Sequence, residues 1–95
     1  MFVVLLRYIK PMEEINKHVA AHRAFLDKYY ASGNLIVSGR MNPPAGGVII
    51  CVAQSREAVE AIMAQDPFNL EKIAEYSIYE FEPNKMAEGF KHFLS

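Results

Sequence analysis

Two short segments of this chain are apolar at nearly every position, and they limit the folds that the chain can adopt. Residues 2–6 read Phe-Val-Val-Leu-Leu, and residues 48–53 read Val-Ile-Ile-Cys-Val-Ala. Such β-branched and aromatic residues favour strands. Successive side chains of a strand point to opposite faces of its sheet, so these strands need cover on both faces. The fold must therefore place a layer on each side of a sheet.

The rest of the chain alternates strand-like and helix-like patterns. Strands are expected over residues 2–9, 35–39, 48–53 and 75–82. A first helix is expected from Pro11 to about Ser32, where Gly33-Asn34 is a usual stop signal. A second helix follows Ser55, whose hydroxyl can cap it, and a short turn or helix is expected over residues 68–72. Residues 42–47 contain two prolines and two glycines and are predicted to form a loop.

This order, β-α-β-β-α-β, is the split βαβ pattern of ferredoxin-like α+β domains. Right-handed crossovers favour a four-stranded antiparallel sheet with both helices on one face. We expect a single domain over residues 1–95, with a core over 1–83 and a helically spaced tail over 84–95. The uncovered apolar face predicts a symmetric homodimer through the sheet, although the tail is an alternative cover.

Composition excludes several classes of protein. The formal net charge of the chain is -1, and its ten Lys and Arg form no run, which argues against a nucleic-acid partner. The lone cysteine, Cys51, can form neither an internal disulfide nor a spaced zinc site. The first residues lack the features of a signal peptide, and the apolar run 2–6 is too short to span a bilayer. We therefore expect a cytoplasmic protein without a membrane partner.

A histidine occupies a position on the predicted first helix where an apolar residue is expected. His22 lies three residues after Val19 and four before Leu26, on the stripe that such a helix buries. A titratable ring that faces the inside of a small domain needs a polar partner. The predicted partner is Asp66, in the segment Asp66-Pro67-Phe68 after the second helix.

The predicted topology brings further polar residues to the same side of the sheet. The first and second strands run parallel, so Arg7, Tyr8 and Ser38 end near the point where the second helix delivers Asp66. An imidazole oriented by a carboxylate suits proton transfer beside a carbonyl group. No serine or cysteine lies in a nucleophile-elbow context, so acyl transfer by a triad is not expected.

Each of these residues also has a structural interpretation. His22 can be a core histidine with a satisfied hydrogen bond, Asp66 a helix N-cap, and Ser38 part of a turn. Arg7 can be a solvated charge on a buried stem. His18 and His22 have the spacing of a metal-chelating pair, but no third ligand has supporting spacing, so neither a metal nor a cofactor is expected.

Several segments, in their order and spacing, resemble the YciI-like (YCII-related) family over nearly the whole chain. They are His22-Arg23-Ala24-Phe25-Leu26, Gly33 to Gly39 with its Ser38-Gly39 end, the double glycine before an apolar strand, and Ala64-Gln65-Asp66-Pro67-Phe68. The resemblance implies a ferredoxin-like fold that dimerises through its sheet, as in dimeric α/β barrels. It also implies a His–Asp active site, which maps onto His22 and Asp66 with Ser38 beside it.

The family includes a dehydrochlorinase that acts on a chlorinated hydroxyhydroquinone. The fold of the family is similar to that of muconolactone isomerase. This sequence has Arg40 where many members have proline after Ser-Gly. It also has Val19, Ala20 and Ala21 where some members carry an arginine before the histidine. If that arginine binds an anionic substrate, Arg7 or Arg40 must replace it here.

The sequence therefore predicts a small dimeric enzyme that performs acid–base chemistry, elimination or isomerisation, on a small oxygenated, cyclic or aromatic metabolite. His22 would transfer the proton, Asp66 would orient it, and Ser38, Tyr8, Arg7 and Arg40 would bind the substrate. One alternative is a ligand-binding or regulatory module without chemistry. Another is a purely structural His–Asp pair.

Overall fold

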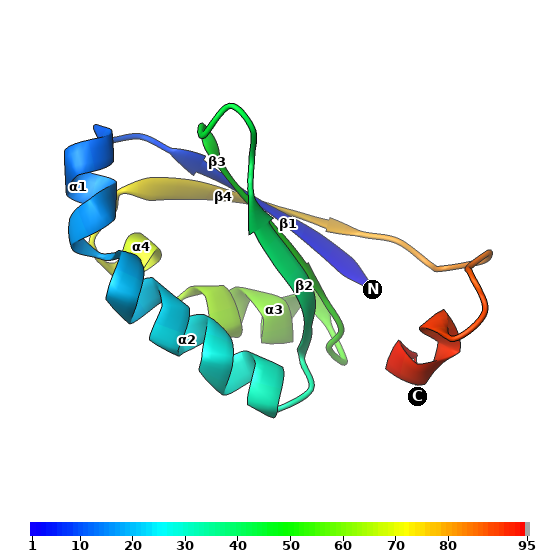
Figure 1. Ribbon diagram of the computed structural model, residues 1–95. Helices are drawn as coiled ribbons and strands as arrows, with labels where there is room; N and C mark the ends of the chain where they lie inside the picture. Colours follow the sequence, from blue (N-terminus) through cyan, green and yellow to red (C-terminus); the bar gives the residue numbers. More distant parts are fainter. Residues whose placement is uncertain (95) are drawn as a thin grey trace.

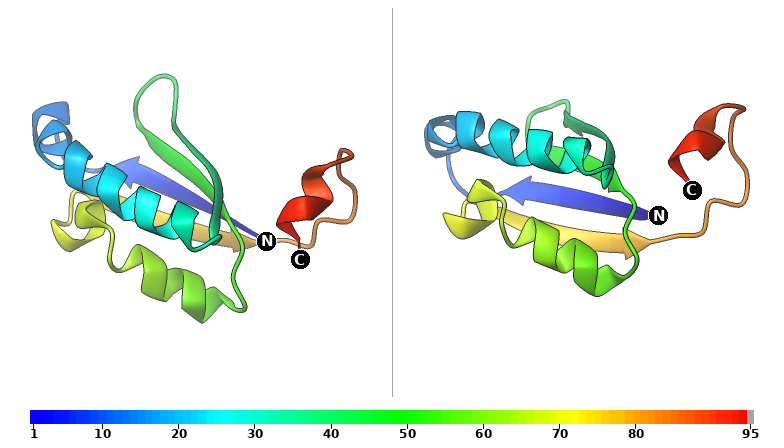
Figure 2. Two further views of the ribbon diagram at one scale, coloured as in Figure 1. Left: turned by 60° about the horizontal axis from the view of Figure 1, so that its bottom comes forward. Right: turned by 90° about the horizontal axis from the view of Figure 1, so that it is seen from below.

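The computed structural model describes residues 1–94, so Ser95, the last residue of the expected tail, lies outside the described residues. Its elements, in chain order, are β1 (Phe2–Tyr8), α1 (Met12–Lys17), α2 (Val19–Ala31), β2 (Leu35–Arg40), β3 (Gly46–Cys51), α3 (Arg56–Met63), α4 (Pro67–Leu70), β4 (Ala74–Glu80) and the 3₁₀ helix η1 (Phe90–Phe93). The strands form one antiparallel sheet in the order β2-β3-β1-β4. The α-helices cover one face of it (Figures 1 and 2). The predicted ferredoxin-like α+β fold is confirmed.

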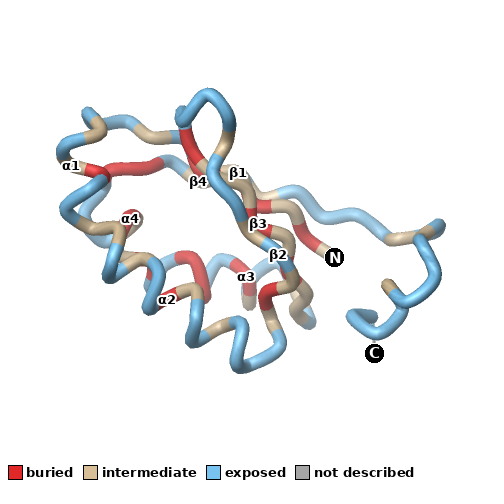
Figure 3. The backbone as a smooth tube through the Cα atoms, in the orientation of Figure 1, coloured by how far each residue is buried: buried red, intermediate tan, exposed pale blue. Residues whose placement is uncertain are grey.

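The core lies between this sheet and the helices, and strand alternation selects its members. Phe2, Val4 and Leu6 of β1 face the helices and are at most 2% exposed. The other buried hydrophobic residues are Ile15, Phe25, Leu35, Ile49, Cys51, Val59, Ile62, Met63, Phe68, Ile73 and Ala74. Figure 3 shows that the buried positions lie on the strands and on the helices that cover them. Asp66 is the only charged residue buried among the described residues, which makes its surroundings informative.

The predicted helix from Pro11 to Ser32 is wrong in one respect, because it is two helices. His18 breaks it with φ −114° and ψ 5°, and Pro11 precedes the first helical residue instead of being that residue. Neither proline nor glycine occurs between Met12 and Ala31, so no residue type marks the break. The break turns α1 relative to α2 (Figure 1).

The predicted loop over residues 42–47 ends two residues early, because Gly46 and Gly47 already belong to β3. Gly46 pairs with Arg7 on the central strand β1. A Cβ atom at Gly46 would lie 1.8 Å from the backbone oxygen of Leu6, so only glycine fits this register. Close approach of two central strands, and not a flexible loop, explains this glycine.

The remaining boundaries differ by one or two residues. Ser55 caps α3 as predicted, accepting a hydrogen bond from the backbone N–H of Ala58. The strand predicted over 75–82 is Ala74–Glu80, and the turn predicted over 68–72 is the short helix α4. The tail forms only the 3₁₀ turn η1 and lies beyond the end of the sheet, not over its open face (Figures 1 and 2).

The face of the sheet opposite the helices is largely apolar. Val3, Leu5 and Ile50 are partly exposed there, and Val37 and Tyr79 are 54% and 57% exposed. No segment of residues 1–94 covers this face (Figures 1 and 2). The homodimer stays a prediction. None of the helices in this stretch has the length and apolar content needed to cross a bilayer.

Candidate functional site

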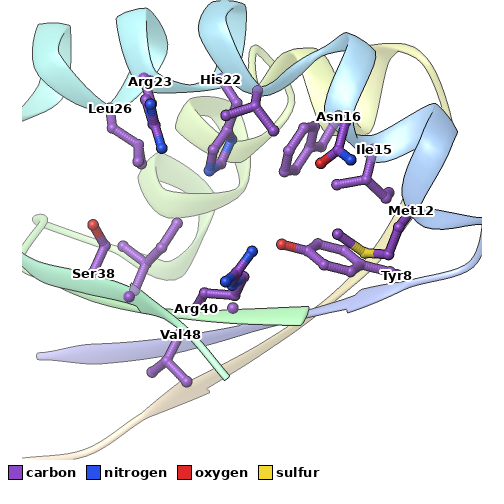
Figure 4. Close-up of a pocket in the computed structure, with 15 residues that line it drawn as sticks. Tyr8, Met12, Ile15, Asn16, His22, Arg23, Leu26, Ser38, Arg40 and Val48 are labelled. Carbon is purple, nitrogen blue, oxygen red and sulfur yellow. The ribbon is translucent and has the colours of Figure 1, made fainter. Parts of the chain in front are cut away.

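A pocket of about 410 Å³ opens between the helices α1 and α2 and the strands β2 and β3. Apolar side chains from both layers form most of its wall. Tyr8, His22, Ser38 and Arg40 also line it, so four of the six residues that the sequence predicts for a site meet in one cavity (Figure 4). A mostly apolar cleft with a few convergent polar groups is the usual form of a small-molecule site.

The predicted His–Asp pair is present in the structure. His22 Nδ1 lies 2.7 Å from Asp66 Oδ1. The His22 side chain is 15% exposed and the Asp66 side chain is fully buried. An ionised carboxylate can only accept hydrogen bonds, so Nδ1 donates to it and Nε2 is the basic nitrogen. The His22 ring lines the pocket (Figure 4), which makes it the member of the pair that a bound molecule can reach.

Asp66 accepts three hydrogen bonds, which explains how a carboxylate is tolerated at zero exposure. Its Oδ1 accepts from His22 and from the backbone N–H of Phe68 at 3.0 Å. Its Oδ2 accepts from the hydroxyl of Tyr76, on β4, at 2.5 Å. The bond to Phe68 is the N-cap of α4, so the N-cap interpretation and the His-partner interpretation of Asp66 both hold.

The surroundings of Tyr76 raise the pKa of its phenol. Burial is the main cause that raises the pKa of its phenol, and the charge of Asp66 and the hydrogen bond to it raise the pKa further. The hydroxyl therefore keeps its proton and serves as a fixed donor to Asp66. Tyr76 comes from β4, so the carboxylate is held from the sheet as well as from α4.

The imidazole ring is also held by stacking. The rings of His22 and Phe68 lie 4.1 Å apart between centroids with an interplanar angle of 3°. Tyr8 meets the edge of Phe68 at 6.0 Å and 89°. With Asp66 fixing one edge of the imidazole and Phe68 covering one face, the ring has little freedom to turn.

The opposite wall of the pocket comes from β2. Ser38 and Arg40 are two residues apart on this strand, so both face the helices. The Ser38 hydroxyl lies 2.7 Å from the Tyr30 hydroxyl. Burial raises the pKa of the Tyr8 phenol, and the charge of Arg40 opposes this effect. Arg40 is therefore close enough to influence a phenol or enol at this wall.

Arg7 lies elsewhere. It neighbours Leu6 and Tyr8 on β1, both of which face the helices, so strand alternation directs it to the opposite face of the sheet. There it forms an exposed ion pair with Glu75. The structure therefore does not bring Arg7 to the pocket.

The residues that were not predicted as site residues include Arg23 and Phe68, which line the pocket, and Tyr76, which contacts Asp66. Arg23 continues the spacing Asn16, Val19, Arg23 and Leu26, all of which line the pocket, and that periodicity was available in the sequence. The phenol of Tyr76, on β4, contacts Asp66, which lies ten residues earlier in the chain at the start of α4. No local pattern indicates that contact.

The arrangement can transfer a proton. Nε2 of His22 can take or return one, Asp66 stabilises the resulting imidazolium, and Arg40 and Tyr8 can stabilise negative charge on a substrate oxygen. Within the described part of the chain, no cluster of three or more His, Cys, Asp or Glu is arranged to hold a metal ion.

Comparisons with known proteins agree with the fold described above. Residues 1–82 match the profile of the YCII-related domain. A solved structure with the same fold is 5-chloro-2-hydroxyhydroquinone dehydrochlorinase (TftG) from Burkholderia phenoliruptrix AC1100, in complex with 2,5-dihydroxybenzoquinone. It has a TM-score of 0.72 and 20% sequence identity, over 86% of this chain and 94% of that chain. No curated protein matches in sequence.

Proposed function

The chain belongs to the YCII-related domain family, and we propose that it is a small enzyme performing His–Asp acid–base chemistry on a small oxygenated ring compound. The observation that carries the proposal is the contact between His22 and the buried Asp66 at the wall of a pocket. A purely structural pair does not need one member to line a cavity. The structural neighbour supports the ring-compound class, because its name describes a dehydrochlorinase of a hydroquinone.

The proposed cycle needs only groups of this chain. Nε2 of His22 removes a proton from a carbon or hydroxyl group of the substrate, and Asp66 stabilises the imidazolium. In an elimination the electron pair expels the leaving group as an anion, and the imidazolium then releases its proton to solvent. In an isomerisation His22 returns the proton to another carbon. Tyr8, Ser38 and Arg40 bind the oxygen atoms of the substrate and the charge that develops on them.

The direct test uses a panel of hydroxylated and keto ring compounds in D₂O, beginning with 5-chloro-2-hydroxyhydroquinone, followed by proton NMR. The wild-type protein should accelerate deuterium exchange or elimination for at least one compound. His22→Gln should lower that rate by about 10²–10⁴-fold, because it keeps size and polarity but removes proton transfer. Asp66→Asn should also lower it, because an amide can hold the imidazole in the wrong tautomer.

Circular dichroism checks that both variants are folded. Turnover by His22→Gln at the wild-type rate would refute the proposal. Binding of panel compounds to wild type and His22→Gln alike, with neither exchange nor product, would instead support a ligand-binding module. If no panel compound shifts the NMR signals of the His22 ring, and if these signals do not change with pH, the pair is structural.

We further propose that the protein is a homodimer through the open face of the sheet. Val37 and Tyr79 are large, exposed and apolar on this face. Sedimentation should give a dimer for the wild type and a monomer for Val37→Lys. Leu70→Lys is the control, because Leu70 is 63% exposed on α4, on the helical side. A monomeric wild type at micromolar concentration would contradict the proposal. The cytoplasmic location stays a prediction.

A further inference from the structure

Among residues 1–94, Arg23 and Arg40 differ from the other two arginines in having no carboxylate partner. The other two each form an ion pair with a glutamate, Arg7 with Glu75 and Arg56 with Glu60. Across residues 1–94, neither Arg23 nor Arg40 forms an ion pair, although Asp27 lies one turn beyond Arg23 on α2. Both line the pocket that contains His22.

The two guanidinium groups approach the pocket from different layers. Arg23 extends from α2 toward the cavity, and Arg40 rises from β2 beside Tyr8 (Figure 4). The His22 ring extends from α2 into the same pocket, so both arginines share its wall with the imidazole (Figure 4). They come from consecutive elements of the chain, and the packing of α2 against the sheet brings both to one cavity.

The charge of the described pocket lining is entirely positive. Arg23 and Arg40 line the pocket, and no Asp or Glu is among its lining residues. Asp66 lies behind the imidazole at zero exposure, where three donors already use its oxygens. A cleft with charge of one sign concentrates ligands of the opposite sign. Guanidinium groups bind carboxylates with two parallel hydrogen bonds, and their charge does not depend on pH in the ordinary range.

We propose that the pocket takes an anionic ring compound, a cyclic or aromatic carboxylate, whose carboxylate is bound by Arg23 and Arg40 while a reactive carbon faces Nε2 of His22. The inference rests on the proposed function in taking this pocket as the substrate site and a ring compound as the substrate. It adds Arg23 to the binding residues and narrows the substrate class from oxygenated rings to charged ones.

The test compares benzoate with benzamide, which have similar shapes and differ in charge. Each is titrated into the full-length ¹⁵N-labelled protein, and amide shifts are followed by NMR. Benzoate should shift pocket amides and bind at least about tenfold more tightly than benzamide, since hydrogen bonds between charged groups are about twice as strong as neutral ones. Added salt should weaken benzoate binding and leave benzamide binding unchanged.

Arg23→Gln and Arg40→Gln should each weaken benzoate binding about tenfold and leave benzamide binding unchanged. Arg7→Gln is the matched control, because Arg7 lies on the opposite face of the sheet, and it should bind benzoate as the wild type does. Equal affinity for the two probes, no shifts with either at millimolar concentration, or benzoate binding that survives both pocket substitutions would overturn the inference.

The His22→Gln variant separates this inference from the proposed function. Its affinity for benzoate should be within about threefold of the wild-type affinity, because the arginines and not the imidazole bind the carboxylate. If His22→Gln keeps turnover while benzoate is still preferred, the proposed chemistry fails and the anion site stands. If turnover depends on His22 but benzoate and benzamide bind equally, the chemistry stands and the anion site fails.

Discussion

Replacing Tyr76 with phenylalanine removes one hydroxyl group and tests whether the buried carboxylate depends on it. The Tyr76 hydroxyl donates to Oδ2 of Asp66 at 2.5 Å, and the Asp66 side chain is fully buried. Without this donor, Oδ2 has no partner from the protein. Loss of a hydrogen bond to a charged group costs about 1.5–3 kcal/mol, so Tyr76→Phe should lower the free energy of unfolding by about 2 kcal/mol. For a domain of this size, the midpoint of thermal unfolding should fall by about 8–16 °C.

Urea unfolding followed by far-UV circular dichroism measures this loss at one fixed protein concentration, since dimerisation would make stability depend on concentration. The slope of the free energy against urea should not change. Tyr79→Phe is the matched control, because Tyr79 lies on the same strand but on the other face of the sheet, away from Asp66. It should stay within about 0.5 kcal/mol of the wild type. If Tyr76→Phe is as stable as Tyr79→Phe, the hydroxyl does not hold Asp66, and our description of the carboxylate is wrong.

Three further outcomes are expected. Gly46→Ala should destabilise the protein by about 3 kcal/mol or more in urea unfolding, because its Cβ would meet the Leu6 backbone, whereas Gly39→Ala, with open space at its Cβ, should change little. Phe68→Ala should cost about 3–5 kcal/mol by the same measurement, because the ring is 2% exposed; a loss below about 1 kcal/mol would contradict tight packing there. Burial raises the pKa of the Cys51 thiol from 9.0 to about 11, so the folded state binds this proton more tightly. The resulting stability is complete below pH 9 and is lost as the pH rises toward 11. The urea midpoint should decrease between pH 9 and pH 11, and this decrease should be smaller for Cys51→Ala than for the wild type.

Much of the fold follows from local patterns. The strand of residues 2–8 is set by its run of β-branched and aromatic residues, and Ser55 begins α3 because its hydroxyl accepts a backbone N–H. The antiparallel sheet follows from the order of elements and the right-handed crossover rule. The helix break at His18 was not predictable in this way, because no proline or glycine accompanies it. The break depends on how the two helical segments pack, which spacing does not encode.

Some features of the candidate site were also predictable from the sequence. The position of His22 on an inward stripe predicted a polar partner, and the topology predicted that Asp66 would reach it, as the 2.7 Å contact shows. Alternation along β1 also explains why Arg7 and Tyr8, as neighbours, cannot face the same cavity. Because Tyr8 faces the helices, the same alternation places Arg7 on the face of the sheet away from them.

The sequence by itself determined most of the elements, since strand-forming runs, helix caps and stop signals depend on near neighbours in the chain. It also named polar residues that this order of elements could bring together. Tertiary structure decided which of them do meet. Tyr76 reaches Asp66 from β4, and Arg23 and Arg40 reach one pocket from α2 and β2. Hydrogen bonds and electrostatic fields depend on distance in space, and that distance exists only after the helices pack on the sheet.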